Sequence, residues 1–296
     1  MKERKRENRR FVWRRNAAMA LAALLLPLLA AGQSLLLTNP PGENAKISLR
    51  SFWPTYNNLE FPSAMFDLYF RVPLNSRTSI IGAVPFLTLK QKENWMGTPW
   101  QRLSGIGDVS LGLQQVLKSI ENRTISVTAG VYLPTMAQGD RYGYGMSLAE
   151  FGYNTDYAEF PKSMPGYATL FATAAYQQFD RRGNHFGLEA GPLFLIPAKG
   201  DYRGNPVATF LGYGVSGGLK LGSFDLSAEV AGRVQVFGFV DEVYLYFSHQ
   251  AAVGLSWGRG PVRPGLFYTL RLNPGYQDFR GAFGVNLEID LGGKRR

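Results

Sequence analysis

About twelve segments of this chain alternate apolar side chains with polar or small ones, over some ten residues each. In the clearest segment, 124–133, Ile125, Val127 and Val131 alternate with Ser126 and Thr128. Successive side chains of a β-strand point to opposite faces, so each segment would be a strand with one apolar face. Such strands suit a soluble sandwich, or a barrel with lipid outside and water inside. The predicted strands are 46–53, 64–72, 79–89, 104–117, 124–133, 167–178, 186–196, 207–220, 224–236, 243–257, 262–272 and 282–291.

The lengths of the connections favour the barrel. Every second connection is a short turn: 74–77, 119–123, 180–184, 221–223 and 258–261. The others are mostly long: 54–63, 90–107, 134–166, 198–205 and 273–280, with the short 238–242 as the exception. Short turns on one rim and long loops on the other are typical of outer-membrane barrels. We therefore predict an all-β fold: a transmembrane antiparallel up-and-down β-barrel of about twelve strands, within roughly 10–14.

The N-terminus has the pattern of an export signal. Residues 1–15 hold eight Lys or Arg, residues 17–31 are apolar, and Ala30, Ala31 and Gly32 offer small residues for cleavage before Gln33. A permanent anchor is the alternative, but 15 apolar residues interrupted by Pro27 are short for a membrane span. We predict a signal peptide at 1–32 and an outer-membrane barrel at 33–296.

Removal of that segment changes the charge of the chain. The chain has 32 basic and 22 acidic residues, and the segment holds eight and two of them, which leaves 24 and 20, a net charge of +4. Little excess remains to attract nucleic acid, and we expect no nucleic-acid partner. Cysteine is absent, which excludes disulfides and thiolate metal sites.

Charged residues on the polar faces of the strands would point into the barrel lumen. They could line a path, set ion preference or hold a substrate headgroup. Alternatively, opposite charges pair across strands and fill the lumen. The sequence leaves both interpretations open, as well as the question of an open or plugged lumen. The candidates for the lumen are Asp67, Arg71, Glu189, Lys220, Asp225, Glu229, Arg233, Arg271, Glu288 and Asp290.

Two patterns could indicate other chemistry. The segment GYGVSG at 212–217 has the spacing of a dinucleotide-binding fingerprint, but it lies inside a predicted strand and no helix follows. A lipid hydrolase would need a nucleophile beside a histidine. His185 is next to a turn, and His249 would point outward while Ser248 and Ser256 point inward. We expect no cofactor, no metal site and no enzymatic activity.

The segment SGIGDVSLGL at 104–113 resembles the outer-membrane family named for the meta-cleavage pathway of phenol degradation, whose members show a similar G-x-G-D before an alternating strand. The motif covers ten residues, and the strand-and-loop layout agrees over most of the mature chain. The resemblance implies a transporter of hydrophobic compounds, loosely similar to long-chain fatty acid channels. It also implies that Gly105, Gly107 and Asp108 are structural residues of a loop-to-strand corner. It assigns no substrate-binding residue.

These observations predict a passive outer-membrane channel for small molecules, including hydrophobic or aromatic ones. Its partners would be the outer-membrane lipid and a small solute; the sequence does not determine an oligomeric state. The main alternative is a non-transporting barrel whose long loop 134–166 binds an external partner. A lipid hydrolase is the third hypothesis.

Overall fold

The computed structural model describes residues 44–55, 62–90, 102–137, 148–156, 158–198, 206–238, 247–258, 260–272 and 280–292. The predicted signal peptide lies outside these residues. Within them, no helix has the length and apolar character needed to cross a membrane.

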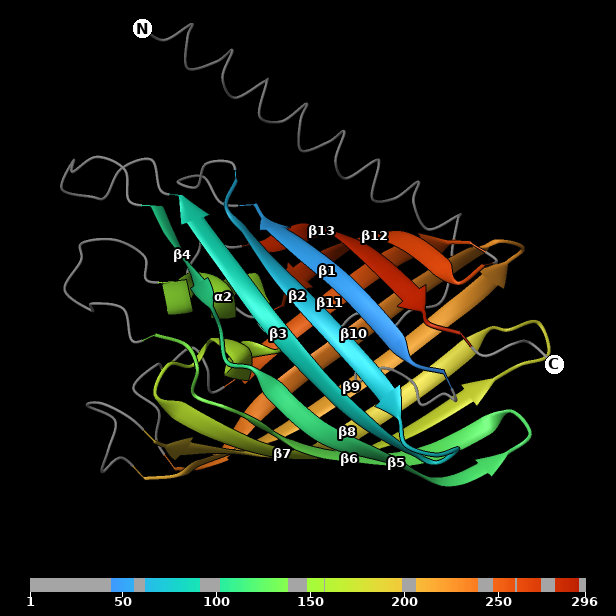
Figure 1. Cartoon of the computed structure of the whole chain (residues 1–296), viewed down its shortest axis with the longest axis horizontal. Coiled ribbons are helices and arrows are strands. Elements are labelled where there is room, and N and C mark those ends of the chain that lie inside the picture. The colour runs from blue at the N-terminus through green and yellow to red at the C-terminus, as the bar shows by residue number, and fades with distance from the viewer. Residues whose placement is uncertain are drawn as a thin grey trace, which may run out of the picture.

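The protein is a single antiparallel sheet closed into a barrel (Figure 1). Strand β1 pairs with β2 on one edge and with β13 on the other, and every other neighbouring pair along the ring is also bonded. The strands are β1 (Lys46–Pro54), β2 (Ala64–Pro73), β3 (Thr78–Lys90), β4 (Arg102–Ile106), β5 (Ser110–Ile120), β6 (Arg123–Tyr132), β7 (Tyr167–Phe179), β8 (His185–Pro197), β9 (Ala208–Leu221), β10 (Phe224–Phe237), β11 (Phe247–Trp257), β12 (Val262–Arg271) and β13 (Gly281–Asp290).

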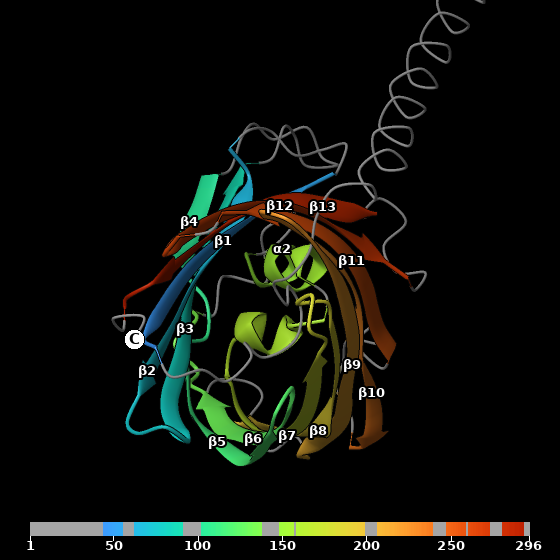
Figure 2. The same cartoon turned by 90° about the vertical axis from the view of Figure 1, so that its right-hand side faces the viewer.

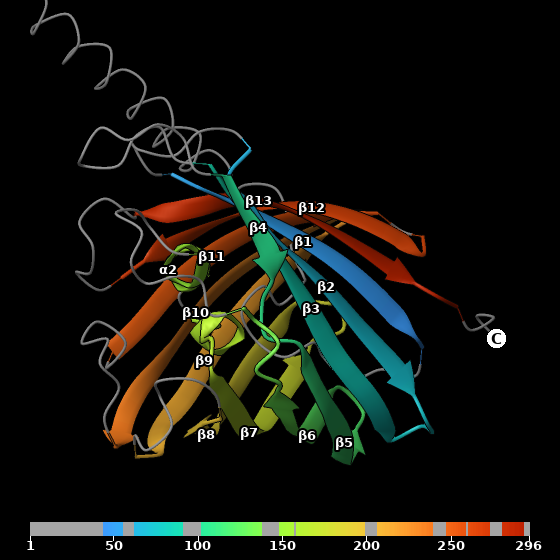
Figure 3. The ribbon, with the colours of Figure 1, turned by 60° about the vertical axis from the view of Figure 1, so that its left-hand side comes forward.

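Strands β4 and β5 occupy one position in the ring, because both pair with β3. The ring therefore has twelve positions, and the predicted barrel of about twelve strands is confirmed. Figure 3 shows β4 and β5 following one another along β3. β4 begins at Arg102, within the predicted loop 90–107, and the predicted strand 104–117 is divided between β4 and β5 by residues 107–109.

A proline lies where the pairing passes from β5 to β4. The ladder with β5 ends at Ala83, and the ladder with β4 begins at Phe86. Pro85 between them has no N–H to donate, so it fits the gap between the two ladders. Its carbonyl still accepts a hydrogen bond from the N–H of Gly107, at 2.9 Å, which holds the corner against the wall.

The two faces of the wall differ as the period-two pattern predicts. On β9, Val215 points outward and Ser216 points into the lumen, where it is only 5% exposed. Outward apolar side chains such as Leu111 and Leu113 are about half exposed, at 48% and 53%. Apolar surface on this scale around a whole barrel is typical of a lipid-facing wall.

The long connection after β6 enters the barrel. It forms helix α2 (Leu148–Thr155) and the short 3₁₀ helix η2 (Phe160–Ser163), and both lie within the ring of strands when the barrel is viewed along its axis (Figure 2). We call residues 148–156 and 158–164 the plug. The predicted all-β fold is confirmed, and these two short helices within the long connection are additional to it. The described part of the loop that the alternative hypothesis assigned to an external partner is therefore inside the barrel.

Prediction for the wall. Val215→Arg should lower the free energy of unfolding in lipid vesicles by about 2–4 kcal/mol, because it places a cation in hydrocarbon near the middle of a strand. Gln177→Arg is the matched control, since Gln177 lies opposite Gly187 on the inner face and is already a long polar side chain partly exposed to the lumen. Urea titration of the two variants measures the difference, and equal losses would contradict the assignment of the outer face.

Candidate functional site

The plug packs on an apolar part of the inner wall near the rim of the long loops. Phe151 of α2 lies in a buried cluster with Phe52, Met65 and Leu87. Phe160 of η2 packs edge to face on Phe210, with ring centroids 5.3 Å apart. The inner face of the barrel thus provides apolar side chains against which α2 and η2 pack.

Gly152 and Thr155 allow α2 to pack closely against the wall. Gly152 lies where an added Cβ would be 2.6 Å from Leu87, so a side chain there would push α2 off the wall. Thr155 donates a hydrogen bond from its hydroxyl to the carbonyl of Phe151 at 2.6 Å, which satisfies a carbonyl in the last turn of the helix.

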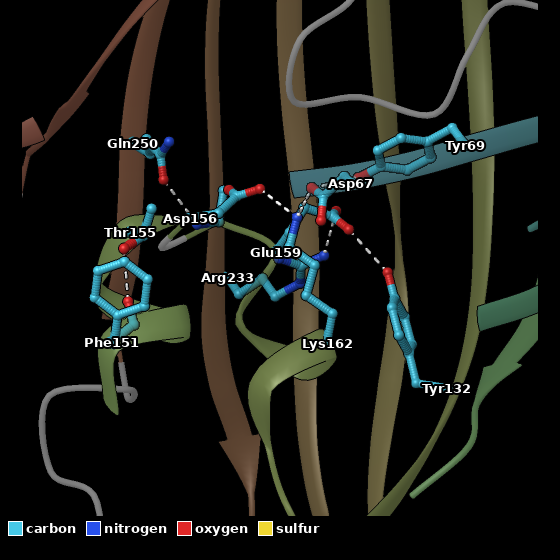
Figure 4. Close-up of polar contacts among 11 residues, drawn as sticks. Asp67, Tyr69, Tyr132, Phe151, Thr155, Asp156, Glu159, Lys162, Arg233 and Gln250 are labelled. Atoms are coloured by element: carbon cyan, nitrogen blue, oxygen red, sulfur yellow. Dashed lines mark hydrogen bonds and ion pairs between the residues drawn. The ribbon is translucent and has the colours of Figure 1, made fainter. Parts of the chain in front are cut away.

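Lys162 is the central charge of the plug. Its ammonium group lies 2.5 Å from a carboxylate oxygen of Asp67 on β2 and 2.5 Å from one of Asp156 in the plug (Figure 4). Lys162 is only 2% exposed. Burial alone would lower the pKa of its ammonium group, but the charges of Asp156 and Asp67 raise this pKa well above the ordinary value of 10.5. Lys162 therefore stays charged and joins the plug to the wall.

Glu159 makes the second charged contact. Its Oε1 lies 3.0 Å from Nη2 of Arg233 on β10, and its Oε2 accepts a hydrogen bond from the hydroxyl of Tyr132 on β6 at 2.8 Å (Figure 4). Burial would raise the pKa of the carboxyl group, but Arg233 and Lys162 hold it below its ordinary value of 4.5. The carboxylate is therefore ionised at neutral pH and bridges two strands.

Two further hydrogen bonds complete the attachment. Nη1 of Arg271 on β12 donates to the side-chain oxygen of Asn154 at 2.6 Å. The backbone N–H of Ala158 donates to the side-chain oxygen of Gln250 on β11 at 3.0 Å. The plug thus contacts strands from both halves of the chain.

The corner at Gly107 and Asp108 also supports the plug. The N–H of Asp108 donates to the carbonyl of Lys162 at 2.7 Å, and an added Cβ at Gly107 would lie 2.5 Å from the same oxygen. The Asp108 carboxylate is fully buried and accepts a hydrogen bond from the N–H of Met136 at 2.8 Å. Gly105 lies in β4, packed near Leu148 of α2.

A cavity of about 90 Å³ lies in the lumen beside Glu159. Three cations line it: Arg50 on β1, Arg71 on β2 and Arg233. The guanidinium of Arg50 stacks on the ring of Tyr69, 3.9 Å from its centre. The lining also includes Tyr132, Phe171, Leu193 and the carboxylates of Glu159 and Glu189. An arginine-rich cavity with aromatic walls can hold a small anion or polar solute.

The structure brings some of the predicted lumen residues together and leaves others apart. Arg71, Glu189 and Arg233 line the cavity, and Asp67 pairs with Lys162. Glu229 points inward on β10 and is 2% exposed. The remaining candidates have partners elsewhere in the lumen. Lys220 and Asp225 form an ion pair with each other, and Glu288 lies 2.7 Å from Lys46 and 3.7 Å from Arg263. Arg271 and Asp290 are hydrogen-bonded to Asn154 and Asn44.

Sequence reasoning missed the residues that connect wall and plug. Arg50, Tyr69 and Tyr132 lie in strands that the alternation predicts, but nothing in their spacing distinguishes them from other inner-face residues. Asp156, Glu159 and Lys162 were assigned to a loop. Ser147 and Glu150 have the spacing of a helix capping box, which could have predicted α2.

The patterns considered for other chemistry are placed as follows. His249 is on the outer face of β11, with its ring 5.7 Å from that of Tyr213, whereas Ser248 is buried on the inner face. His185 begins β8 next to the turn. The GYGVSG segment lies entirely within β9. The described residues contain no group of three or more His, Asp or Glu arranged to hold a metal ion.

Among comparisons with known proteins, only the search of solved structures finds similar chains. No protein-family model matches the chain, and no curated protein matches it in sequence. Among solved structures, an outer-membrane channel from Pseudomonas putida F1 is similar, with 12% identity, 87% of this chain and 98% of that chain covered, and a TM-score of 0.56. Outer-membrane phospholipase A from Escherichia coli aligns at 12% identity over 90% and 96% of the two chains, with a TM-score of 0.40. At 12% identity, the similarity to the Pseudomonas channel shows the barrel fold alone, and nothing is inferred from the similarity to the phospholipase.

Prediction for Lys162. Lys162→Ala leaves two buried carboxylates without their cation, which should weaken docking of the plug by about 3–5 kcal/mol. The chain has no cysteine, so Met164→Cys, at a position 5% exposed, provides a single reporter thiol. Because each 1.4 kcal/mol is a factor of ten, maleimide labelling should accelerate by at least about 100-fold in vesicles.

Lys118→Ala, in the same Met164→Cys background, is the control, because Lys118 is exposed at the rim of the short turns. Equal labelling rates in the Lys162 and Lys118 variants would show that the ion pairs do not hold the plug.

Prediction for pH. The pKa of the Glu159 carboxyl group is lower in the folded protein than its ordinary value of 4.5. The contact of Glu159 with Arg233 is therefore fully present above pH 4.5 and is lost as the pH falls through the lowered pKa of the folded state. The raised pKa of Lys162 means that its contact is present below 10.5 and is lost only above it. Hydrogen exchange of residues 148–163, corrected for intrinsic rates, should therefore increase as the pH falls below about 4.5 and as it rises above about 10.5. Exchange that changes at neither end would contradict these assignments.

Proposed function

We propose that this protein is an outer-membrane channel that passes small solutes by diffusion through a lumen narrowed by its own plug. The cavity beside Glu159 is the observation that carries the proposal. It lies in the lumen and is lined by charged and aromatic side chains that converge from strands around the ring. A barrel filled only for rigidity would not need a polar cavity at this position.

The location in the outer membrane is part of the same proposal. The barrel has an apolar outer face, connections sorted by length, and the fold of a known outer-membrane channel. The pattern of residues 1–32 supports export and cleavage of the leader. The resemblance of 104–113 to the family of the phenol meta-cleavage pathway supports solutes that include hydrophobic or aromatic compounds.

The non-transporting barrel is the second candidate. The ion pairs and buried rings that attach the plug to the wall favour it, because they keep the lumen narrow. A lipid hydrolase has less support, since His249 and Ser248 are on opposite faces of β11. Neither a non-transporting barrel nor a hydrolase would let solutes cross a membrane that contains the purified protein, so a permeation measurement distinguishes both from a channel.

Prediction for permeation. In planar bilayers the wild-type protein should show small, reproducible conductance steps, and a variant with residues 148–163 replaced by a short Gly-Ser linker should show steps several-fold larger. The linker leaves the barrel wall intact and removes the plug side chains that narrow the lumen, so the conducting path becomes wider. Liposome swelling with neutral aromatic solutes measures the same difference without an applied field.

Replacing the exposed turn residues 181–182 with Gly-Ser is the control for the substitution itself. A wild type that passes neither ions nor aromatic solutes would contradict the proposal. Conduction by the linker variant alone would favour the non-transporting barrel.

A further inference from the structure

Glu159 occupies a site that is suited to a free carboxylate. Its two oxygens bind different partners, one the guanidinium of Arg233 and the other the hydroxyl of Tyr132. An arginine side chain has five N–H donors in a planar fork, and a carboxylate that is free to turn accepts two of them in parallel. Glu159 is held by η2 and uses only one oxygen for Arg233.

The guanidinium of Arg233 retains capacity for another acceptor. Its Nε is buried and has no hydrogen-bond partner among the described residues. Arg233 and Glu159 both line the cavity, so an anion that enters it and displaces Glu159 would meet this guanidinium. A buried donor without an acceptor is unfavourable, and a ligand carboxylate could supply the missing acceptor.

The charges around the cavity favour an anion in place of Glu159. The lining holds three guanidinium groups, of Arg50, Arg71 and Arg233, and two carboxylates, of Glu159 and Glu189. If Glu159 turned away, the lining would carry three positive charges and one negative charge. A carboxylate from solution would restore the balance that Glu159 provides.

The size of the cavity restricts the ligand. Its volume of about 90 Å³ is well below the roughly 300–1,000 Å³ of pockets that hold drug-sized ligands. This suits a carboxylate with a body of one or two carbons. Apolar groups of Phe171 and Leu193 in the lining would contact that body.

We propose that Arg233 and Tyr132 form a binding site for a small monocarboxylate of acetate size, and that this ligand displaces Glu159 and so loosens the plug. Glu159 acts as an internal competitor for the site. Entry of the carboxylate removes one of the two charged contacts between plug and wall, while the contact of Lys162 with Asp67 remains. That such a carboxylate is also a transported solute rests on the proposed channel function, whereas its binding at Arg233 does not.

The test uses the full chain in vesicles, with Met164→Cys as the reporter thiol. Sodium acetate replaces sodium chloride at constant ionic strength, and the rate of maleimide labelling is followed. For a Kd of about 10 mM, 100 mM acetate should raise the rate about tenfold. Equal rates in acetate and chloride would overturn the proposal.

Variants separate the site from a general loosening of the plug. Glu159→Gln removes the competing charge, so the rate without acetate should rise and half-saturation should occur at lower acetate. Arg233→Gln should also raise the rate without acetate, but the response to acetate should be lost. Arg181→Gln, on the exposed turn, should behave as the parent. A full acetate response in Arg233→Gln would overturn the proposal.

Two further measurements keep the outcome decisive. If Arg233→Gln does not fold, Arg233→Lys replaces it, because lysine keeps the charge but lacks the fork and should reduce acetate affinity several-fold. Line broadening of ¹³C-acetate by the Glu159→Gln variant measures binding without any permeation. Acetate binding without conductance would refute the proposed channel and support the carboxylate site. Conductance without acetate binding would support the channel and refute the carboxylate site.

Discussion

Closure of the sheet is the constraint on which the rest of this structure depends. All nine residues of β1 pair with β13, and the same strand pairs with β2 along its other edge. In hydrocarbon every backbone N–H and C=O needs a partner within the protein, and only a ring of strands without free edges provides it for a sheet. Once the ring is closed, period two fixes which side chains face lipid and which face the lumen. The arginines and acids of the inner face are brought together by this closure alone.

The plug fills the part of the lumen that would otherwise expose apolar side chains to water. Burial of Phe151 and Phe160 contributes about 1.5–3 kcal/mol each, whereas buried ion pairs often add little net free energy. The apolar contacts therefore account for most of the docking. The charges determine where the plug sits, because any other position would leave one of them unpaired. At the contact between plug and wall, the cations Arg50, Lys162 and Arg233 lie among the carboxylates of Asp67, Asp156 and Glu159.

The break between β4 and β5 couples the wall to the plug. Pro85 ends one ladder, and Gly107 and Asp108 leave the sheet to meet the carbonyl of Lys162. The G-x-G-D segment was interpreted as a loop-to-strand corner. In the structure it is an interruption within one strand position, and its glycine is needed because the plug backbone approaches too closely for a Cβ.

The sequence by itself determined the barrel. Alternation along 124–133 and 207–220 and the sorting of connections by length depend on local rules, so they were readable without coordinates. The same alternation assigned Asp67, Glu189 and Arg233 to the inner face. The sequence could not determine their partners, because a partner depends on which strands are neighbours across the ring and on whether a loop turns inward. Lys162 and Glu159 are in no strand and follow no period, so only the tertiary structure placed them against Asp67 and Arg233. The apolar inner residues Phe52, Leu87 and Phe210 were visible in the sequence, but only a body inside the barrel explains why they face the lumen.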